Sequence, residues 1–137
     1  SISDGSVSNV IAFKFRDLAN QVAGRVAGAS TSKDITVTTS DISQFNKFAI
    51  SYSTTSDISK FYINGVEVGT ISLAGLTVSG LATLQFNRGS SGGEEFSGKV
   101  RNVQVFKRAM SDGELYLLTV PQYQSYQEMA TALNYTL

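Results

Sequence analysis

The pair Asn64-Gly65 limits the possible folds of this chain more than any other feature. The pair lies between two arms of alternating apolar and polar residues in the run KFYINGVEVGTIS, and Asn-Gly in that setting is the strongest short-range signal for a β-hairpin. The preceding run FNKFAISYS alternates Phe48, Ile50 and Tyr52 on one face, which predicts another strand. The centre of the chain is therefore predicted to form antiparallel sheet.

Further short strands are predicted before this hairpin. A strand at residues 10–16 would place Ile11, Phe13 and Phe15 on one side. A second strand at residues 21–27 would place Val22, Gly24 and Val26 together, and a turn at residues 17–20 joins the two. Residues 34–39 are rich in β-branched side chains and follow a small polar connection at residues 29–32. The strands predicted in this part of the chain are short and closely spaced.

Two more strands are predicted after the hairpin. One surrounds Leu84 and Phe86, after a poorly patterned segment and before a glycine-rich loop. The other covers residues 99–106, where the apolar phase changes, so a β-bulge is predicted near Arg101 and Asn102. Strands at this spacing, separated by turn residues, are typical of an all-β sandwich.

The C-terminal part of the chain is predicted to hold two helices. Ser111 and Glu114 have the spacing of a capping box, and Met110 with Leu115 completes a hydrophobic staple around the same helix start. A second, amphipathic helix is predicted at residues 120–137. Its apolar stripe would consist of Tyr123, Tyr126, Met129, Ala130 and Leu133. This stripe packs within the chain or against a neighbouring subunit.

Composition excludes several classes of function. The chain has no cysteine and no histidine, so disulfides, thiolate chemistry and histidine general bases are excluded. Its 11 basic residues balance 11 acidic residues, and no basic run is longer than the pair Lys107-Arg108, so no nucleic-acid partner is predicted. No window approaches the roughly 20 apolar residues that span a bilayer, so no membrane insertion is predicted.

Several runs together resemble a known family. KFAISY, FYING, LQFN, FSGKVRNVQVFKRAMSDGELYLLT and the opening SISDGSVSNVIAFKF resemble the concanavalin A-like lectin/glucanase sandwich in its laminin-G-like form. They are most similar to the versions near the C-termini of phage tail fibres and tailspikes. The resemblance covers residues 1–119 and implies an antiparallel jelly-roll sandwich with a short helix after its last strand. An edge strand usually precedes the SISDG-like stretch in such sandwiches, so we expect an upstream part of a longer protein, or another chain, to supply it.

The sequence lacks the catalytic pattern of the glucanases that the resemblance includes. Those enzymes use a Glu-x-Asp-x-x-Glu arrangement, and no such triplet occurs here. Glu94 and Glu95 are adjacent, so on a strand they would point to opposite faces. We therefore predict that the chain is not an enzyme. No cofactor is predicted either, although a calcium site composed from two loops stays open. Its scattered candidate ligands are Asp4, Asp17, Asn20, Asp34, Asp41, Asp57 and Asn87.

The glycine-rich loop at residues 87–95 is the predicted ligand-binding site. It places Arg, Asn and carboxylate side chains beside glycines, which suits a binding loop and equally an unconstrained connector. Without tryptophan, stacking on a sugar would fall to tyrosine or phenylalanine, and these are expected to serve in the core or in cross-strand pairs. The predicted ligand-binding residues are Asn87, Arg88, Ser90, Glu94 and Glu95.

The resemblance implies a non-catalytic carbohydrate- or receptor-binding module of a phage tail fibre, tailspike or other virion appendage. Its expected partner is a cell-surface glycan or other host receptor, and its expected state is a homo-oligomer, a trimer, at the virion surface. Three alternatives stay open. The chain could be a structural decoration or oligomerisation domain of a virion, an enzyme that uses Glu94 and Glu95 on polysaccharide, or a secreted bacterial adhesion domain.

Overall fold

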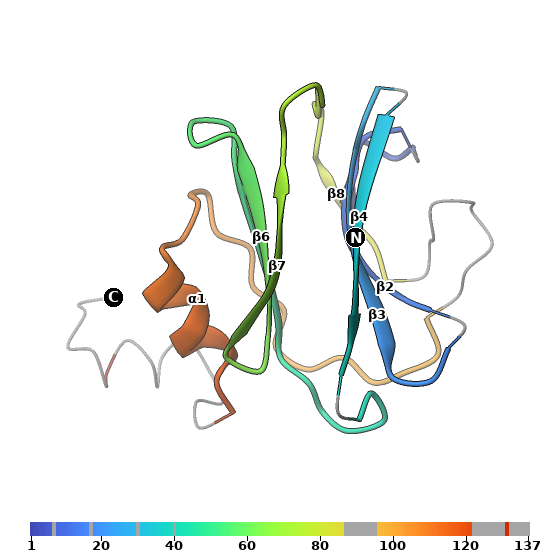
Figure 1. Ribbon diagram of the computed structural model, residues 1–137, viewed down its shortest axis with the longest axis vertical. Coiled ribbons are helices and arrows are strands. Elements are labelled where there is room, and N and C mark those ends of the chain that lie inside the picture. Colours follow the sequence, from blue (N-terminus) through green and yellow to red (C-terminus); the bar gives the residue numbers. More distant parts are fainter. Residues whose placement is uncertain are drawn as a thin grey trace.

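Two antiparallel sheets packed face to face form the body of the protein (Figure 1). The computed structural model describes residues 1–6, 8–16, 18–29, 31–39, 41–86, 96–121 and 131. The strands in these residues are β1 (Ile2–Ser3), β2 (Val10–Phe15), β3 (Gln21–Gly28), β4 (Thr31–Thr38), β5 (Phe48–Ser53), β6 (Ile58–Ile63), β7 (Val66–Ser72) and β8 (Thr83–Leu84), and the helix is α1 (Asp112–Thr119). The predicted all-β sandwich is confirmed.

The larger sheet has the strand order β4-β3-β2-β1-β8. Ile11 on β2 pairs with Val26 on β3, and both side chains are buried against the other sheet. The alternating patterns at residues 10–16 and 21–27 therefore predicted the inner face correctly, because side chains on a strand alternate between its two faces.

The smaller sheet has the strand order β5-β6-β7 and contains the predicted hairpin. Asn64 and Gly65 have φ angles of 51° and 82°, and Ile63 pairs with Val66 across the turn. Two successive positive φ angles are the geometry of the type I′ turn, which asparagine and glycine adopt at low cost. The hairpin prediction is confirmed.

Phe61 lies at the centre of the core between the two sheets. Its side chain is 0% exposed, and its ring meets the ring of Phe13 edge to face at a centroid distance of 5.4 Å. Phe13 in turn contacts Phe48, at 4.9 Å between centroids, so aromatic rings from both sheets join across the interior. Ile50 and Tyr52 pack against the same core, as their alternation with polar residues predicted.

Helix α1 lies on the face of the smaller sheet that points away from the larger one (Figure 1). Both halves of the predicted capping box are present, between Ser111 and Glu114. Met110 and Leu115 are buried with Tyr62 of β6 in a cluster that fixes the helix start on the sheet. The predictions of the helix, its cap and its hydrophobic staple are confirmed.

The predicted start of β4 was wrong. The strand begins at Thr31, which pairs with Gly28, so half of the connection predicted at residues 29–32 belongs to the sheet. Ala29 has a φ of 54°, a left-handed conformation that reverses the chain within a short turn. Because β4 is an edge strand, its small polar residues can face solvent.

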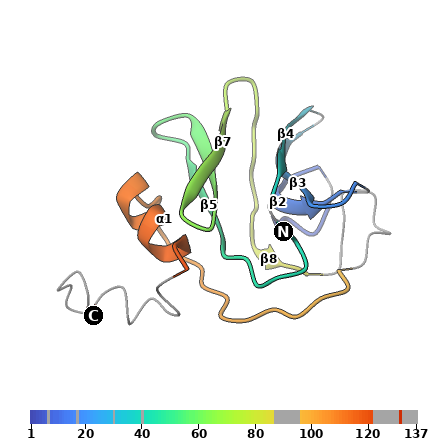
Figure 2. The same ribbon diagram turned by 60° about the horizontal axis from the view of Figure 1, so that its bottom comes forward.

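The strand predicted at residues 99–106 was also wrong, since in the described range 96–111 no residue belongs to a strand. Asn102 has a φ of 45°, which interrupts an extended run. The change of apolar phase therefore marked a break rather than a bulge within a continuous strand. In Figure 2 the segment that leads into α1 crosses from the side of the larger sheet to the side of the smaller one. The strand predicted around Leu84 and Phe86 is shorter than expected, since β8 ends at Leu84 and does not include Phe86.

The helix predicted at residues 120–137 lies almost entirely outside the described residues, so it stays a prediction. Among the helices that the structure describes, none has the length and apolar character needed to cross a lipid bilayer.

Candidate functional site

The five residues predicted to bind a ligand, Asn87, Arg88, Ser90, Glu94 and Glu95, all lie outside the described residues. Their assignment therefore stays a prediction, and so does the catalytic alternative built on Glu94 and Glu95. The described part of the chain offers a different candidate.

A shallow pocket of about 280 Å³ lies beside the start of α1, on the outer face of the smaller sheet. Its volume is close to the lower end of the range for ligand pockets, about 300 Å³. Strands β5 and β6 and the segment before α1 line it. The lining residues are Ser51, Ser53, Ser56, Ile58, Lys60, Ala109, Met110, Ser111 and Asp112.

The floor of this pocket follows from the alternation of side chains along β5. Because Ile50 and Tyr52 point into the core, the serines next to them in the sequence point outward. Ser51 pairs with Lys60 across the sheet, and Ser53 pairs with Ile58. The floor is therefore a row of small hydroxyl side chains flanked by one ammonium group.

The opposite wall comes from residues 109–112, which are distant in the sequence but tied to the sheet. The Ser51 hydroxyl donates to the Met110 carbonyl at 3.4 Å, and the Lys60 ammonium donates to Asp112 Oδ1 at 2.5 Å. Ser111 is the N-cap residue of α1 and also lines the pocket. The sequence predicted Ser111 only as part of the capping box, which is confirmed, and the contribution of Ser111 and Asp112 to the pocket was missed.

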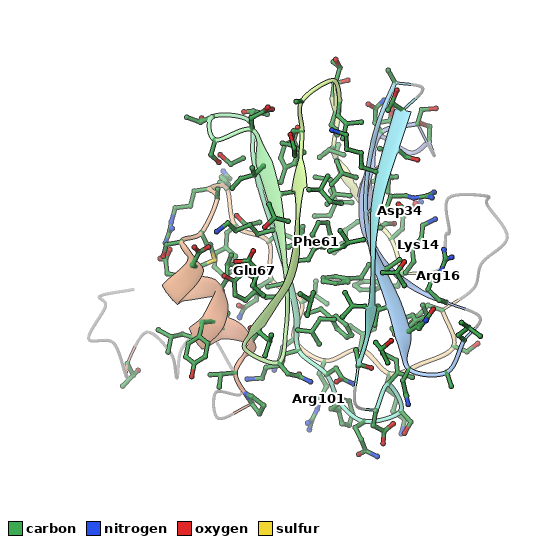
Figure 3. All side chains as sticks on the ribbon, viewed as in Figure 1. Lys14, Arg16, Asp34, Phe61, Glu67 and Arg101 are labelled. Carbon is green, nitrogen blue, oxygen red and sulfur yellow. The ribbon has the colours of Figure 1, made fainter. Side chains whose placement is uncertain are left out.

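Charged groups next to the pocket form one network. The Lys60 ammonium lies 3.7 Å from Glu67 Oε2 as well as beside Asp112, and the Tyr62 hydroxyl donates to Glu67 Oε2 at 3.0 Å. Figure 3 shows Glu67 on the side of the smaller sheet that faces α1. The hydrogen bond from Lys60 lowers the pKa of Asp112, and the same bond raises the pKa of Lys60. Burial, and then the hydrogen bond to Glu67, raise the pKa of Tyr62.

Asp112 does not have the environment of a glycosidase general acid. Two carboxylates approach one ammonium group, but a glycosidase needs one carboxyl group that stays protonated near neutral pH as the general acid. The pKa of Asp112 moves in the opposite direction, because Lys60 stabilises its ionised form. The serine hydroxyls, Lys60 and Asp112 instead offer hydrogen-bond donors and acceptors to a polar ligand.

Three of the acidic residues considered for calcium have other partners, while the candidates Asp17 and Asn87 lie outside the described residues. Asp4 and Asp41 each accept a hydrogen bond from a backbone N–H two residues later, at 2.8 and 2.9 Å. The Arg25 guanidinium donates two hydrogen bonds to Asp34. Within the described ranges, no three acidic residues come together in a way that could hold a metal ion.

Lowering the pH is expected to remove one stabilising interaction at the start of α1. The Arg108 guanidinium, and then the Ser111 backbone N–H, lower the pKa of Glu114 from 4.5 to about 2. Because the pKa is lower in the folded state, this contribution is complete above about pH 4.5 and is lost as the pH falls through about 2. Arg108 is 58% exposed, so we discount the effect for solvent screening to about 1 to 2 kcal/mol.

Urea unfolding of the parent and the Glu114→Gln variant between pH 7 and pH 2 measures this contribution. The parent is expected to be the more stable protein at pH 7, and the difference is expected to shrink below pH 4.5. A difference that stays constant down to pH 2 would contradict the assigned pKa.

The two antiparallel sheets and the single short helix in the described residues define a β-sandwich domain. A model of the concanavalin A-like lectin/glucanases superfamily matches residues 2–115. The chain belongs to this superfamily, and its membership supports a module of the carbohydrate-binding type.

The other comparisons add little. No curated protein matches the chain. Among solved structures, the chain is similar to the crystal structure of an S-layer domain-containing protein (residues 221–444) from Clostridium thermocellum ATCC 27405, with 20% sequence identity and a TM-score of 0.40. The match covers 85% of this chain but only 59% of that chain. We draw nothing about function from a similarity at this level.

Proposed function

We propose that this domain is a non-catalytic carbohydrate-binding module, and that the pocket between β5, β6 and residues 109–112 holds the hydroxyl groups of a sugar. Membership of the lectin/glucanase superfamily carries the proposal. The pocket supports it, because hydroxyl, ammonium and carboxylate groups converge at one shallow opening. A small number of placed polar groups is what fixes the orientation of a ligand in such a site.

The proposed setting is the surface of a virion. The sequence runs that resemble phage tail fibres and tailspikes support this setting, in which the domain is the receptor-binding end of a longer appendage protein. The ligand is then a glycan on the surface of a host cell, and the appendage is a homo-oligomer, a trimer. A multivalent arrangement suits a shallow site, because linked weak sites gain avidity without new contacts.

The test measures retention of the purified domain on a panel of neutral bacterial surface polysaccharides. Ala109→Phe is expected to weaken retention about tenfold or more, because Ala109 lines the pocket and the larger ring fills it. Ala74→Phe is the matched control, since Ala74 is exposed and does not line the pocket. Equal retention of both variants would exclude the pocket, and no retention of the parent in any assembly state would overturn the binding function. Release of reducing ends by the parent would overturn the non-catalytic assignment.

One observation favours a purely structural role as the second candidate. Val100, Val103 and Val105 are 47%, 47% and 65% exposed on the segment that leads into α1. Exposed apolar side chains in a row are typical of interfaces between chains. Sedimentation of the parent and a Val103→Ser, Val105→Ser variant over a range of concentrations separates this role from glycan binding.

A further inference from the structure

The turn between β6 and β7 holds Asn64-Gly65, which is the only Asn-Gly pair in the sequence. Asparagine before glycine is prone to deamidation, because glycine has no side chain to hinder attack by its backbone nitrogen. The nitrogen forms a bond to Cγ of the asparagine, and the side-chain NH2 leaves with the proton of that nitrogen as ammonia. Water then opens the resulting five-membered ring to give aspartate or isoaspartate. The pair is therefore a candidate modification site.

In the folded domain, hydrogen bonds hold each group that takes part in this reaction. Asn64 Oδ1 accepts from the Lys47 backbone N–H at 2.9 Å, and Asn64 Nδ2 donates to Asn46 Oδ1 at 2.7 Å. The attacking nitrogen, that of Gly65, donates to the Thr119 hydroxyl oxygen at 3.0 Å. The two halves of the reaction are thus bound to different partners, one on the segment before β5 and the other on α1.

Thr119 is suited to keep the Gly65 nitrogen unreactive. It is the last residue of α1 and is 1% exposed, and Figure 1 shows the turn beside this end of the helix. The Thr119 hydroxyl donates its own proton to the Leu115 carbonyl at 2.7 Å, so its oxygen faces Gly65 as an acceptor. A backbone nitrogen must lose its proton before it attacks Cγ. A neutral hydroxyl group binds this proton without removing it.

The backbone of the turn is a second barrier to deamidation. Asn64 and Gly65 have φ angles of 51° and 82°, and closure of the five-membered ring requires Asn64 to leave this left-handed conformation. Gly65 also lies against the end of the helix, because a Cβ atom there would be 3.4 Å from both Tyr116 and Val120. Rotation of the turn therefore requires the turn to separate from α1.

We propose that Asn64 is a deamidation site that is closed in the folded domain and reacts only when the turn separates from α1, with Thr119 as the residue that keeps it closed. The reaction would make this separation permanent. An ionised aspartate has no proton to donate to Asn46 Oδ1, and isoaspartate lengthens the backbone of the turn by one carbon atom. Deamidation at this site does not depend on glycan binding, so the two proposals fail separately.

Peptide mapping by mass spectrometry measures the modification, since it separates asparagine, aspartate and isoaspartate at position 64. The folded parent is incubated at mildly alkaline pH, and the same chain in concentrated urea at the same pH is the reference. Because only the open state reacts, the folded chain is expected to deamidate at least about tenfold more slowly than the unfolded one. Equal rates in the two conditions would overturn the proposal without the need for any variant.

Substitutions at Thr119 test its assigned role. Thr119→Val removes the acceptor for the Gly65 N–H, so this variant is expected to deamidate about tenfold faster than the folded parent. Thr119→Ser keeps a hydroxyl group and is expected to react at nearly the parent rate. Thr70→Val is the matched control, because the Thr70 hydroxyl on β7 donates to Glu67 and does not contact the turn. Circular dichroism establishes that each variant is folded.

A destabilised variant distinguishes local opening from unfolding of the whole domain. Gly28→Ala places a methyl group against the backbone of Thr77, in the loop after β7, and leaves the turn and Thr119 unchanged. Its rate of deamidation is expected to stay within about twofold of the parent rate, because its turn still packs on α1. A rate in Gly28→Ala or Thr70→Val as high as that in Thr119→Val would overturn the proposal, and so would a parent-like rate in Thr119→Val.

Discussion

Replacing Phe61 with alanine is expected to destabilise the domain by about 3 to 5 kcal/mol, which is the usual range for a fully buried phenylalanine. The side chain is 0% exposed and contacts Phe13 edge to face. Its ring also lies directly over Gly24 of the opposite sheet, since a Cβ atom at that glycine would come within 2.5 Å of the ring. Alanine would therefore leave a cavity bounded by both sheets, and neither sheet can collapse into it alone.

Urea and thermal unfolding measure this loss, which is a large fraction of the 5 to 15 kcal/mol that typically stabilises a domain. Phe86→Ala is the control, because Phe86 is 46% exposed and its removal is expected to cost about 1 kcal/mol or less. Similar losses in the two variants would mean that Phe61 does not join the sheets. The m-values of the two variants are compared as well, because a changed m-value would indicate a change in the compactness of one state.

Most of the strands and their inner faces could be predicted from the sequence, because the signals are local. The turn at Asn64-Gly65 needs only two residues with positive φ, and the cap at Ser111 needs only the Glu114 side chain three residues later. Such signals are complete within a few residues, so tertiary contacts strengthen them without changing them.

The failed predictions concern segments whose structure depends on distant partners. Residues 99–106 have the composition of a strand, but an apolar alternation does not show whether a neighbouring strand is present to pair with it. The positive φ of Asn102 depends on the path of the chain between the two sheets. The start of β4 was missed because small polar residues read as a loop, although an edge strand tolerates them on its solvent side.

The pocket could not be predicted for the same reason. Its two walls meet through contacts between Lys60 and Asp112, and between Ser51 and Met110, which are 52 and 59 residues apart in the sequence. Each residue had a sufficient local explanation, as an outward strand position or as part of a helix start. Only the position of α1 on the smaller sheet brings them together, and Leu115 and Tyr62 determine that position.

The outer face of the larger sheet could be predicted in part. The alternation of residues 10–16 and 21–27 already implies that Lys14 and Arg25 point away from the core. The missing step was the register between β2 and β3, which sets Ala12 opposite Arg25 and Lys14 opposite Ala23. A shift of one residue would place Lys14 in the core, so the buried inner face also fixes the composition of the outer one.

The Gly28→Ala substitution is expected to destabilise the domain by about 2 to 3 kcal/mol. The Gly69→Ala substitution adds the same methyl group but is expected to cost less than about 1 kcal/mol. At Gly28 the new Cβ would lie 2.5 Å from the Thr77 carbonyl oxygen and 2.9 Å from the Val78 nitrogen. These are backbone atoms of the loop that follows β7. The loop cannot move away easily, because Leu73 is buried in the core and Val78 packs against it.

At Gly69 the new Cβ would also come within 2.5 Å of another atom, but that atom is Cδ1 of Ile35. The end of an isoleucine side chain can rotate, and alanine recovers some of the backbone entropy that a glycine within a strand loses on folding. The free energies of unfolding of Gly28→Ala and Gly69→Ala, measured by urea denaturation, therefore compare a rigid neighbour with a flexible one at the same distance. Equal losses of stability in the two variants would show that the loop after β7 moves as easily as the Ile35 side chain. The contact of this loop with β3 would then not be a rigid one.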